Sequence, residues 1–210
     1  MTDSKLIEGN REFVKDISTE LDAKMTILTV KGQSPKTLFI GCCDSRVAPN
    51  IITNTHIGDL FISRTIGNFV SPYDPDASYP ASASAVEYAV SALNVETIVV
   101  CGHTHCGAIA GLFGLDTLDD REFSNTKKWL SLGTKAKDEV LKLITKDTSE
   151  REKLEMTEKL SAVYQLDNLL TYPAVKKRVE EGTLTLNAWH YNIDTGIVSR
   201  YDSKTKEFVI

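Results

Sequence analysis

Two short cysteine-containing clusters constrain this chain most, because each is joined directly to a predicted buried strand. The first is CCDSR at 42–46, which follows the apolar run TLFIG at 37–41. The second is CGHTHC at 101–106, which begins where the β-branched run TIVVC at 97–101 ends. A third apolar run, DLFISR at 59–64, lies between them, and small residues predict a helix over 81–93. This alternation of strands and helices predicts a parallel α/β sheet.

The remaining patterns complete the predicted fold. Apolar positions among charged ones predict an amphipathic helix over 6–17, and a second helix over 19–30 should stop at Gly32. The stretch 112–170 is predicted to be mostly helical, with a solvent-facing surface where charges alternate. Segments 184–191 and 196–203 flank the turn NIDTG and predict a hairpin. We expect a single domain over 1–210: an α/β fold with a short parallel sheet flanked by helices, an antiparallel C-terminal strand and a helical N-terminal arm at 1–32.

Composition narrows the classes of partner. A chain of 210 residues is long enough for one well-buried core. The net charge of −5 argues against nucleic acid or an anionic membrane as partner. No apolar run approaches the roughly 20 residues that a membrane-spanning helix needs. The N-terminal residues lack an apolar signal core, and the four cysteines do not form a secreted disulfide pattern, so we expect a cytoplasmic protein.

The cysteines and one histidine form a candidate metal site. Thiolates and imidazole suit zinc, and the spacing His103-x-x-Cys106 lets one turn supply two ligands. Ligands bind at the carboxyl edge of parallel sheets, so Cys42 should join them if the strands at 37–41 and 97–101 are neighbours. Three ligands without an evident fourth predict a catalytic zinc ion with an open coordination position. Buried cysteines beside a surface histidine, with no metal, are the alternative.

Two charged residues extend the candidate site. Asp44 lies two positions after Cys42, near enough to become a fourth ligand or to accept a hydrogen bond from metal-bound water. Arg46 can hold that carboxylate in paired hydrogen bonds, which would keep it ionised and away from the metal. We therefore expect Asp44 to orient a zinc hydroxide, with an ordinary surface ion pair as the alternative.

The pattern Cys42-x-Asp44-x-Arg46 followed by His103-x-x-Cys106 resembles the β-class carbonic anhydrases. The similarity covers nearly the whole chain, through segments such as GDLFISR at 58–64, NLLTYPAV at 168–175 and AWHYNIDTG at 188–196. The resemblance implies a zinc lyase that interconverts carbon dioxide and bicarbonate, with one zinc ion per chain. It also implies a homodimer or homotetramer with each site at a subunit interface. By position, it implies substrate-binding roles for Gln33, Phe61, Ile66, Tyr88 and Gly107.

Several alternatives stay open. Packing alone would explain Phe61, Ile66 and Tyr88, and Gln33 could be an ordinary loop residue. A zinc hydrolase of carbonyl sulfide or carbon disulfide would use the same ligands on another linear triatomic molecule. A binding protein with a structural zinc, or a thiol enzyme using Cys42 or Cys43 with His103, are further alternatives.

The ligand set also leads to a hypothesis about pH. Two thiolates and a neutral imidazole leave a Zn²⁺ site formally uncharged, so it should polarise water less than a three-histidine site does. We therefore expect activity that rises with pH and is modest near neutrality. His105 is a candidate proton shuttle, although a solvent-facing loop histidine is the favoured interpretation, and His56 and His190 have no expected role.

Overall fold

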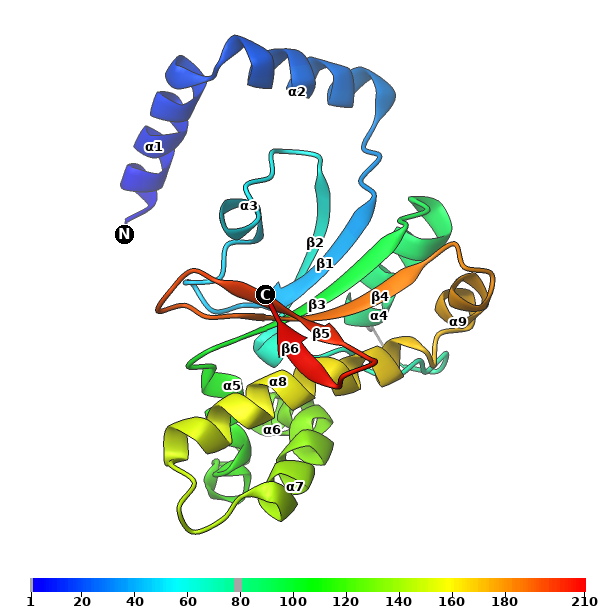
Figure 1. The fold of residues 1–210 in the computed structure, drawn as a ribbon. Coiled ribbons are helices and arrows are strands. Elements are labelled where there is room, and N and C mark those ends of the chain that lie inside the picture. Colours follow the sequence, from blue (N-terminus) through cyan, green and yellow to red (C-terminus); the bar gives the residue numbers. More distant parts are fainter. Residues whose placement is uncertain (1, 78–80) are drawn as a thin grey trace.

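A mixed β-sheet forms the centre of the computed structural model, which describes residues 2–77 and 81–210 (Figure 1). The strand order is β2-β1-β3-β4-β5-β6. The strands are β1 (Thr37–Cys42), β2 (Leu60–Thr65), β3 (Thr97–His103), β4 (Thr185–Tyr191), β5 (Val198–Asp202) and β6 (Glu207–Val209). The first four run parallel, whereas β5 and β6 are antiparallel additions after β4. The predicted fold class is confirmed, and β6 is an additional strand that the sequence patterns did not indicate.

The register of the inner strands brings the two cysteine clusters together. β1 pairs directly with β3, and Gly41 lies opposite Cys101. β1 and β3 are almost wholly buried, which agrees with their continuous apolar sequences. Because both strands are one or two residues longer than predicted, Cys42 and His103 are their last residues rather than loop residues.

Helices flank the sheet (Figure 1). They are α1 (Asp3–Asp16), α2 (Thr19–Lys31), α3 (Pro49–Ile52), α4 (Ala81–Glu87), α5 (Gly107–Leu112), α6 (Ser124–Leu130), α7 (Thr134–Leu143), α8 (Glu150–Leu169) and α9 (Pro173–Glu180). The helix expected over 81–93 is present as α4 followed by a π-helical turn, Tyr88–Ala92. None of the described helices is long and apolar enough to cross a membrane.

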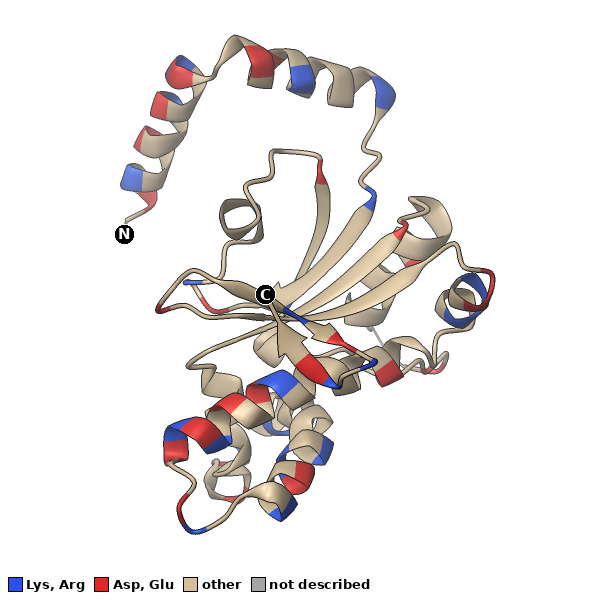
Figure 2. Cartoon of the chain, viewed as in Figure 1, with Lys and Arg blue, Asp and Glu red and all other residues tan. Residues whose placement is uncertain are grey.

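Helix α8 differs from its predicted exposure. It begins at a capping box, in which the Ser149 hydroxyl and the Glu152 carboxylate each bind the other residue's backbone N–H. Its charged residues are concentrated toward its N-terminal half (Figure 2), where Glu150 and Glu152 are exposed. One charged residue, Glu158, departs from the expected solvated face, because it lies on the face that packs against β3 and β4. That buried face consists of Thr157, Glu158, Ser161, Ala162, Gln165 and Leu169.

The N-terminal arm stands away from the sheet (Figure 1). Neither α1 nor α2 has a buried residue, and Leu6, Phe13 and Val14 are exposed on α1. The ion pair between Lys24 Nζ and Asp59 Oδ1, 2.6 Å apart, joins α2 to the loop before β2. Helical periodicity therefore predicted the two helices, but the single chain fully buries none of their apolar side chains.

Candidate metal centre

Three buried residues meet at the carboxyl edge of the sheet. Cys42 ends β1, His103 ends β3, and Cys106 follows one turn later. One ligand atom from each of the three lies within 4.8 Å of the other two. The convergence expected from adjacent parallel strands is therefore present in the structure.

The histidine presents a free lone pair to this cluster. His103 Nδ1 lies 2.8 Å from the Thr104 carbonyl oxygen, which can only accept, so Nδ1 carries the proton. Nε2 is then an acceptor, and it is buried without a hydrogen-bond partner among the described residues. An unsatisfied buried acceptor is costly. A metal ion would satisfy it, and the backbone hydrogen bond at Nδ1 is typical of a metal-ligating histidine.

Each of the two thiols shifts the pKa of the other. A hydrogen bond from the Cys106 thiol lowers the pKa of Cys42, and the backbone N–H groups of Asp44 and Gly67 lower it further. The same hydrogen bond and burial raise the pKa of Cys106. Both shifts arise because the two sulfur atoms lie close together beside an imidazole nitrogen. Zinc binds thiolates and neutral imidazole in this number, so this donor set fits zinc.

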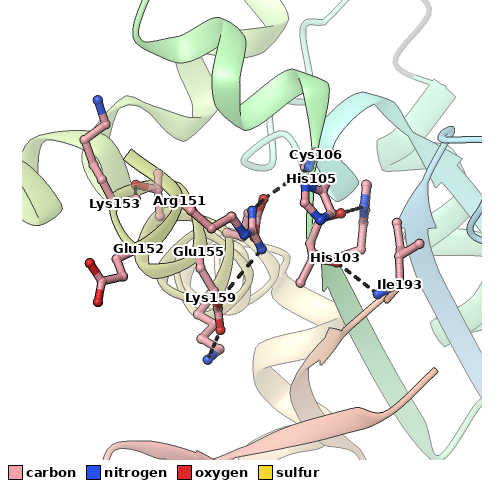
Figure 3. Close-up of polar contacts among 12 residues, drawn as sticks. His103, His105, Cys106, Arg151, Glu152, Lys153, Glu155, Lys159 and Ile193 are labelled. Atoms are coloured by element: carbon pink, nitrogen blue, oxygen red, sulfur yellow. Dashed lines mark hydrogen bonds and ion pairs between the residues drawn. The ribbon is translucent and has the colours of Figure 1, made fainter. Parts of the chain in front are cut away.

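The C-terminal hairpin supports the ligand turn from one side. The Thr104 N–H donates to the Tyr191 carbonyl over 3.0 Å, and the Ile193 N–H donates to Thr104 Oγ1 over 2.9 Å (Figure 3). His105 adopts a left-handed conformation, with φ of 60°, and its Nε2 lies 3.0 Å from Asp194 Oδ2. His105 is exposed, as a solvent-facing loop histidine should be.

Arg46 holds Asp44 in a two-pronged contact. Arg46 Nε donates to Oδ1 of Asp44 over 2.9 Å, and Nη2 donates to Oδ2 over 2.7 Å. These hydrogen bonds hold the pKa of the Asp44 carboxyl well below its usual range. Arg46 Nη2 also donates to the His105 carbonyl over 3.1 Å, which connects the two clusters. The carboxylate is therefore ionised, and both of its oxygens are engaged by arginine.

Sequence reasoning missed two residues that contact the clusters. Arg64, near the end of β2, donates from Nε to the Cys42 carbonyl over 2.9 Å and from Nη2 to the Asp44 carbonyl over 2.7 Å. Its place at the same sheet edge was a signal that could have identified it. Glu158 accepts a hydrogen bond from the Cys106 N–H, and its helical spacing from Ser161, Ala162 and Gln165 was the available signal.

Two of the five expected substrate-binding residues lie near the cluster. Ile66 is half-exposed and lines a cavity of about 530 Å³ together with Cys43, Arg64 and Trp129. Trp129 Nε1 donates to the Ile66 carbonyl over 2.8 Å and so fixes this segment. Gly107 directly follows Cys106 as the first residue of α5.

The other three residues lie toward the opposite edge of the sheet. Gln33 is exposed and precedes the first residue of β1, whereas Cys42 is its last. Phe61 of β2 pairs with Leu38 of β1 near the start of both strands. The ring centroid of Phe61 is 5.8 Å from that of Tyr88. Within one chain, Gln33, Phe61 and Tyr88 are therefore not brought to the metal cluster.

The fold and donor set together define an α/β protein with a candidate Cys–His–Cys metal centre at the carboxyl edge of its parallel strands. A family model described as carbonic anhydrase matches residues 37–198. Carbonic anhydrase of Synechocystis sp. is 40% identical over 208 residues, covering 98% of this chain and 73% of the relative. Carbonic anhydrase of Pseudomonas aeruginosa is 35% identical over 205 residues, covering 97% of this chain and 90% of the relative.

Solved structures give the same result. The β-carbonic anhydrase CcaA superimposes with a TM-score of 0.89 at 37% identity, covering 98% of both chains. A structure from work on two tetrameric β-carbonic anhydrases of Sordaria macrospora has a TM-score of 0.80 at 26% identity, covering 94% of this chain and 95% of that one. The chain belongs to the β-carbonic anhydrase family, as its sequence motifs indicated.

Proposed function

We propose that this protein is a zinc-dependent carbonic anhydrase that catalyses the reversible hydration of carbon dioxide to bicarbonate and a proton. The carrying observation is the buried cluster of Cys42, His103 and Cys106 in a chain of this family. These three residues would hold zinc, with both cysteines as thiolates and His103 neutral. When bound, zinc would lower the pKa of a coordinated water and so supply a hydroxide nucleophile.

Asp44 and Arg46 are the proposed catalytic pair. Arg46 fixes both carboxylate oxygens of Asp44 and keeps them from turning onto the metal. The ionised carboxylate can accept a hydrogen bond from the nucleophile, which orients it for attack on carbon dioxide. The observed contact of Arg46 with both oxygens supports a site in which Asp44 is not a metal ligand and the fourth position is open.

A small apolar substrate needs dry walls and few donors. Ile66 is proposed as part of the wall, and the backbone N–H of Gly107 as a donor to a substrate oxygen. The first N–H groups of a helix have no partner within that helix, which supports this role for Gly107.

We further propose that Gln33, Phe61 and Tyr88 complete the site of a partner subunit in a homodimer or homotetramer. Their distance from the cluster of their own chain supports this, as does the 50% exposure of Tyr88. We treat residues 1–210 as one domain whose arm, with its exposed apolar side chains, packs on that partner. The four cysteines are free thiols, which supports a location in a reducing cytoplasm.

Light scattering should therefore give a mass of at least twice the 23.2 kDa of the chain. Replacing two of the arm's exposed apolar side chains by Phe13→Asp with Val14→Asp should shift the mass toward that of a monomer. A wild-type protein that is monomeric while fully active would contradict the shared site.

The direct test of the function is stopped-flow hydration of carbon dioxide on protein of measured zinc content, recorded across pH. We expect activity that rises with pH, disappears after chelation and returns with added zinc. Protein that retains zinc but hydrates no carbon dioxide at any pH would instead indicate a structural metal.

A further inference from the structure

Glu158 is a buried carboxylate directly behind the ligand turn. It lies on α8 and is only 2% exposed. Its Oε1 accepts from the backbone N–H of Cys106 over 3.1 Å, so it contacts the main chain of a proposed metal ligand. Neither the proposed reaction nor the sequence patterns assign a role to this carboxylate.

Two further side chains bind the same carboxylate. Arg151, two turns earlier on α8, donates from Nη1 to Oε1 over 3.2 Å and from Nη2 to Oε2 over 3.3 Å. His190, on β4, has its Nε2 3.4 Å from Oε2. Figure 3 shows Arg151 extending from α8 toward Cys106. A carboxylate only accepts, so each of these neighbours is a donor, and together they offset the cost of burying its charge.

The contact acts on the backbone where the ligand turn ends and α5 begins. Cys106 precedes α5 in an extended conformation, with φ of −71° and ψ of 114°, and follows the left-handed His105. Helix α8 also approaches β3 very closely here, since a Cβ added to Gly102 would lie 3.0 Å from the Glu158 carbonyl oxygen. The Cys106 amide is thus bound to a helix that packs closely on β3.

We propose that Glu158 is a positioning residue of the metal centre, which fixes the Cys106 backbone so that its sulfur faces Cys42 and His103 before metal binds. Arg151 and His190 hold the carboxylate in place. This inference rests on the proposed zinc function. Loss of comparable partners of metal ligands weakens metal binding by roughly 10- to 100-fold.

The test is Glu158→Gln, with zinc affinity measured by competition with a chelator. The amide keeps the shape but has one acceptor oxygen, so its NH₂ group must face a donor from Cys106, Arg151 or His190. We expect zinc affinity to fall about 10- to 100-fold. The thiolate-to-cobalt absorption of the Co²⁺-substituted protein should change as well, because the geometry of one sulfur ligand has altered. A purely structural role would lower the unfolding temperature without changing that spectrum.

The matched control is Glu155→Gln, the same substitution one turn earlier on the same helix. Glu155 is part of partly exposed ion pairs with Lys159 and Arg151. Its zinc affinity and cobalt spectrum should match those of the wild type. Should Glu158→Gln fail to fold, Arg151→Gln keeps the carboxylate but removes one support, and should weaken zinc binding about 10-fold, the lower end of the range for such partners.

Two failures can be separated. Wild-type protein that binds no zinc would overturn the proposed function. Zinc-binding wild type, with Glu158→Gln of equal affinity and unchanged cobalt spectrum, would overturn only the positioning role. If that variant does not fold, unchanged affinity and spectrum in Arg151→Gln would do the same.

Discussion

Replacing Cys42 with serine should remove zinc from the purified protein and lower kcat/KM for carbon dioxide hydration by more than about 100-fold. A direct ligand should matter more than an outer partner, whose loss costs roughly 10- to 100-fold. Serine is a much weaker zinc ligand than a thiolate, and Cys42 is the residue that joins β1 to the His103–Cys106 turn. Metal analysis and stopped-flow kinetics on the same preparation would measure both effects.

Cys43→Ser is the matched control for this variant. Cys43 is the adjacent residue, but its thiol is exposed and not part of the cluster. Partial burial and the neighbouring Cys42 raise the pKa of Cys43, which leaves little thiolate at neutral pH. Zinc content and rate should therefore stay at wild-type levels. If Cys43→Ser lost activity while Cys42→Ser kept it, the thiol-enzyme alternative would replace the zinc mechanism.

Asp44→Asn should lower kcat/KM by about 100-fold while leaving zinc content unchanged, which is within the range for loss of a positioned acid–base group. The asparagine keeps the size of the side chain, but its amide cannot accept both prongs of the Arg46 fork. The nucleophile would then lose an ionised acceptor. A variant that loses zinc, or one that keeps its full rate, would contradict the proposed role of Asp44.

Glu96→Gln provides the comparison for a carboxylate in an ordinary ion pair. Glu96 lies 2.7 Å from Lys36 Nζ, the same separation as Arg46 Nη2 and Asp44 Oδ2, but both partners are mostly exposed. Such exposed ion pairs contribute little to the free energy of folding. The rate should therefore be unchanged in Glu96→Gln.

The lowered pKa of Asp44 limits how pH can act on the site. The carboxylate is fully ionised above its ordinary pKa of 3.8, and the stabilisation from its pairing with Arg46 is lost only as pH falls toward the lower folded-state pKa. A rise in rate between about pH 6 and 9 therefore cannot come from ionisation of Asp44. If the rate falls toward the acid end of that range, the fall should also be present in Glu96→Gln and should come from the ionisation of another group.

The sequence predicted the metal cluster because its geometry follows from few rules. Strands that run parallel end at the same edge, so residues following β1 and β3 had to lie close together once those strands were neighbours. The Asp44–Arg46 contact is local, across two residues, and could be predicted in the same way.

Other parts depended on interactions that local patterns do not encode. Alternating charge along α8 predicted a solvated face, and the buried Glu158 can be identified as an exception only when Arg151, His190 and the Cys106 amide are known to surround it. The location of Gln33 was beyond prediction for another reason. It precedes the strand that Cys42 ends, so its relation to any site depends on how subunits assemble.

The absence of a side chain at Gly102 limits how this site could be transferred to another protein. With the carbonyl of Glu158 only 3.0 Å from where a side chain would begin, even alanine would force helix and strand apart. A graft of the His103–Cys106 turn onto another α/β scaffold would therefore have to include helix α8. The turn alone would lack the Glu158 contact to the Cys106 amide.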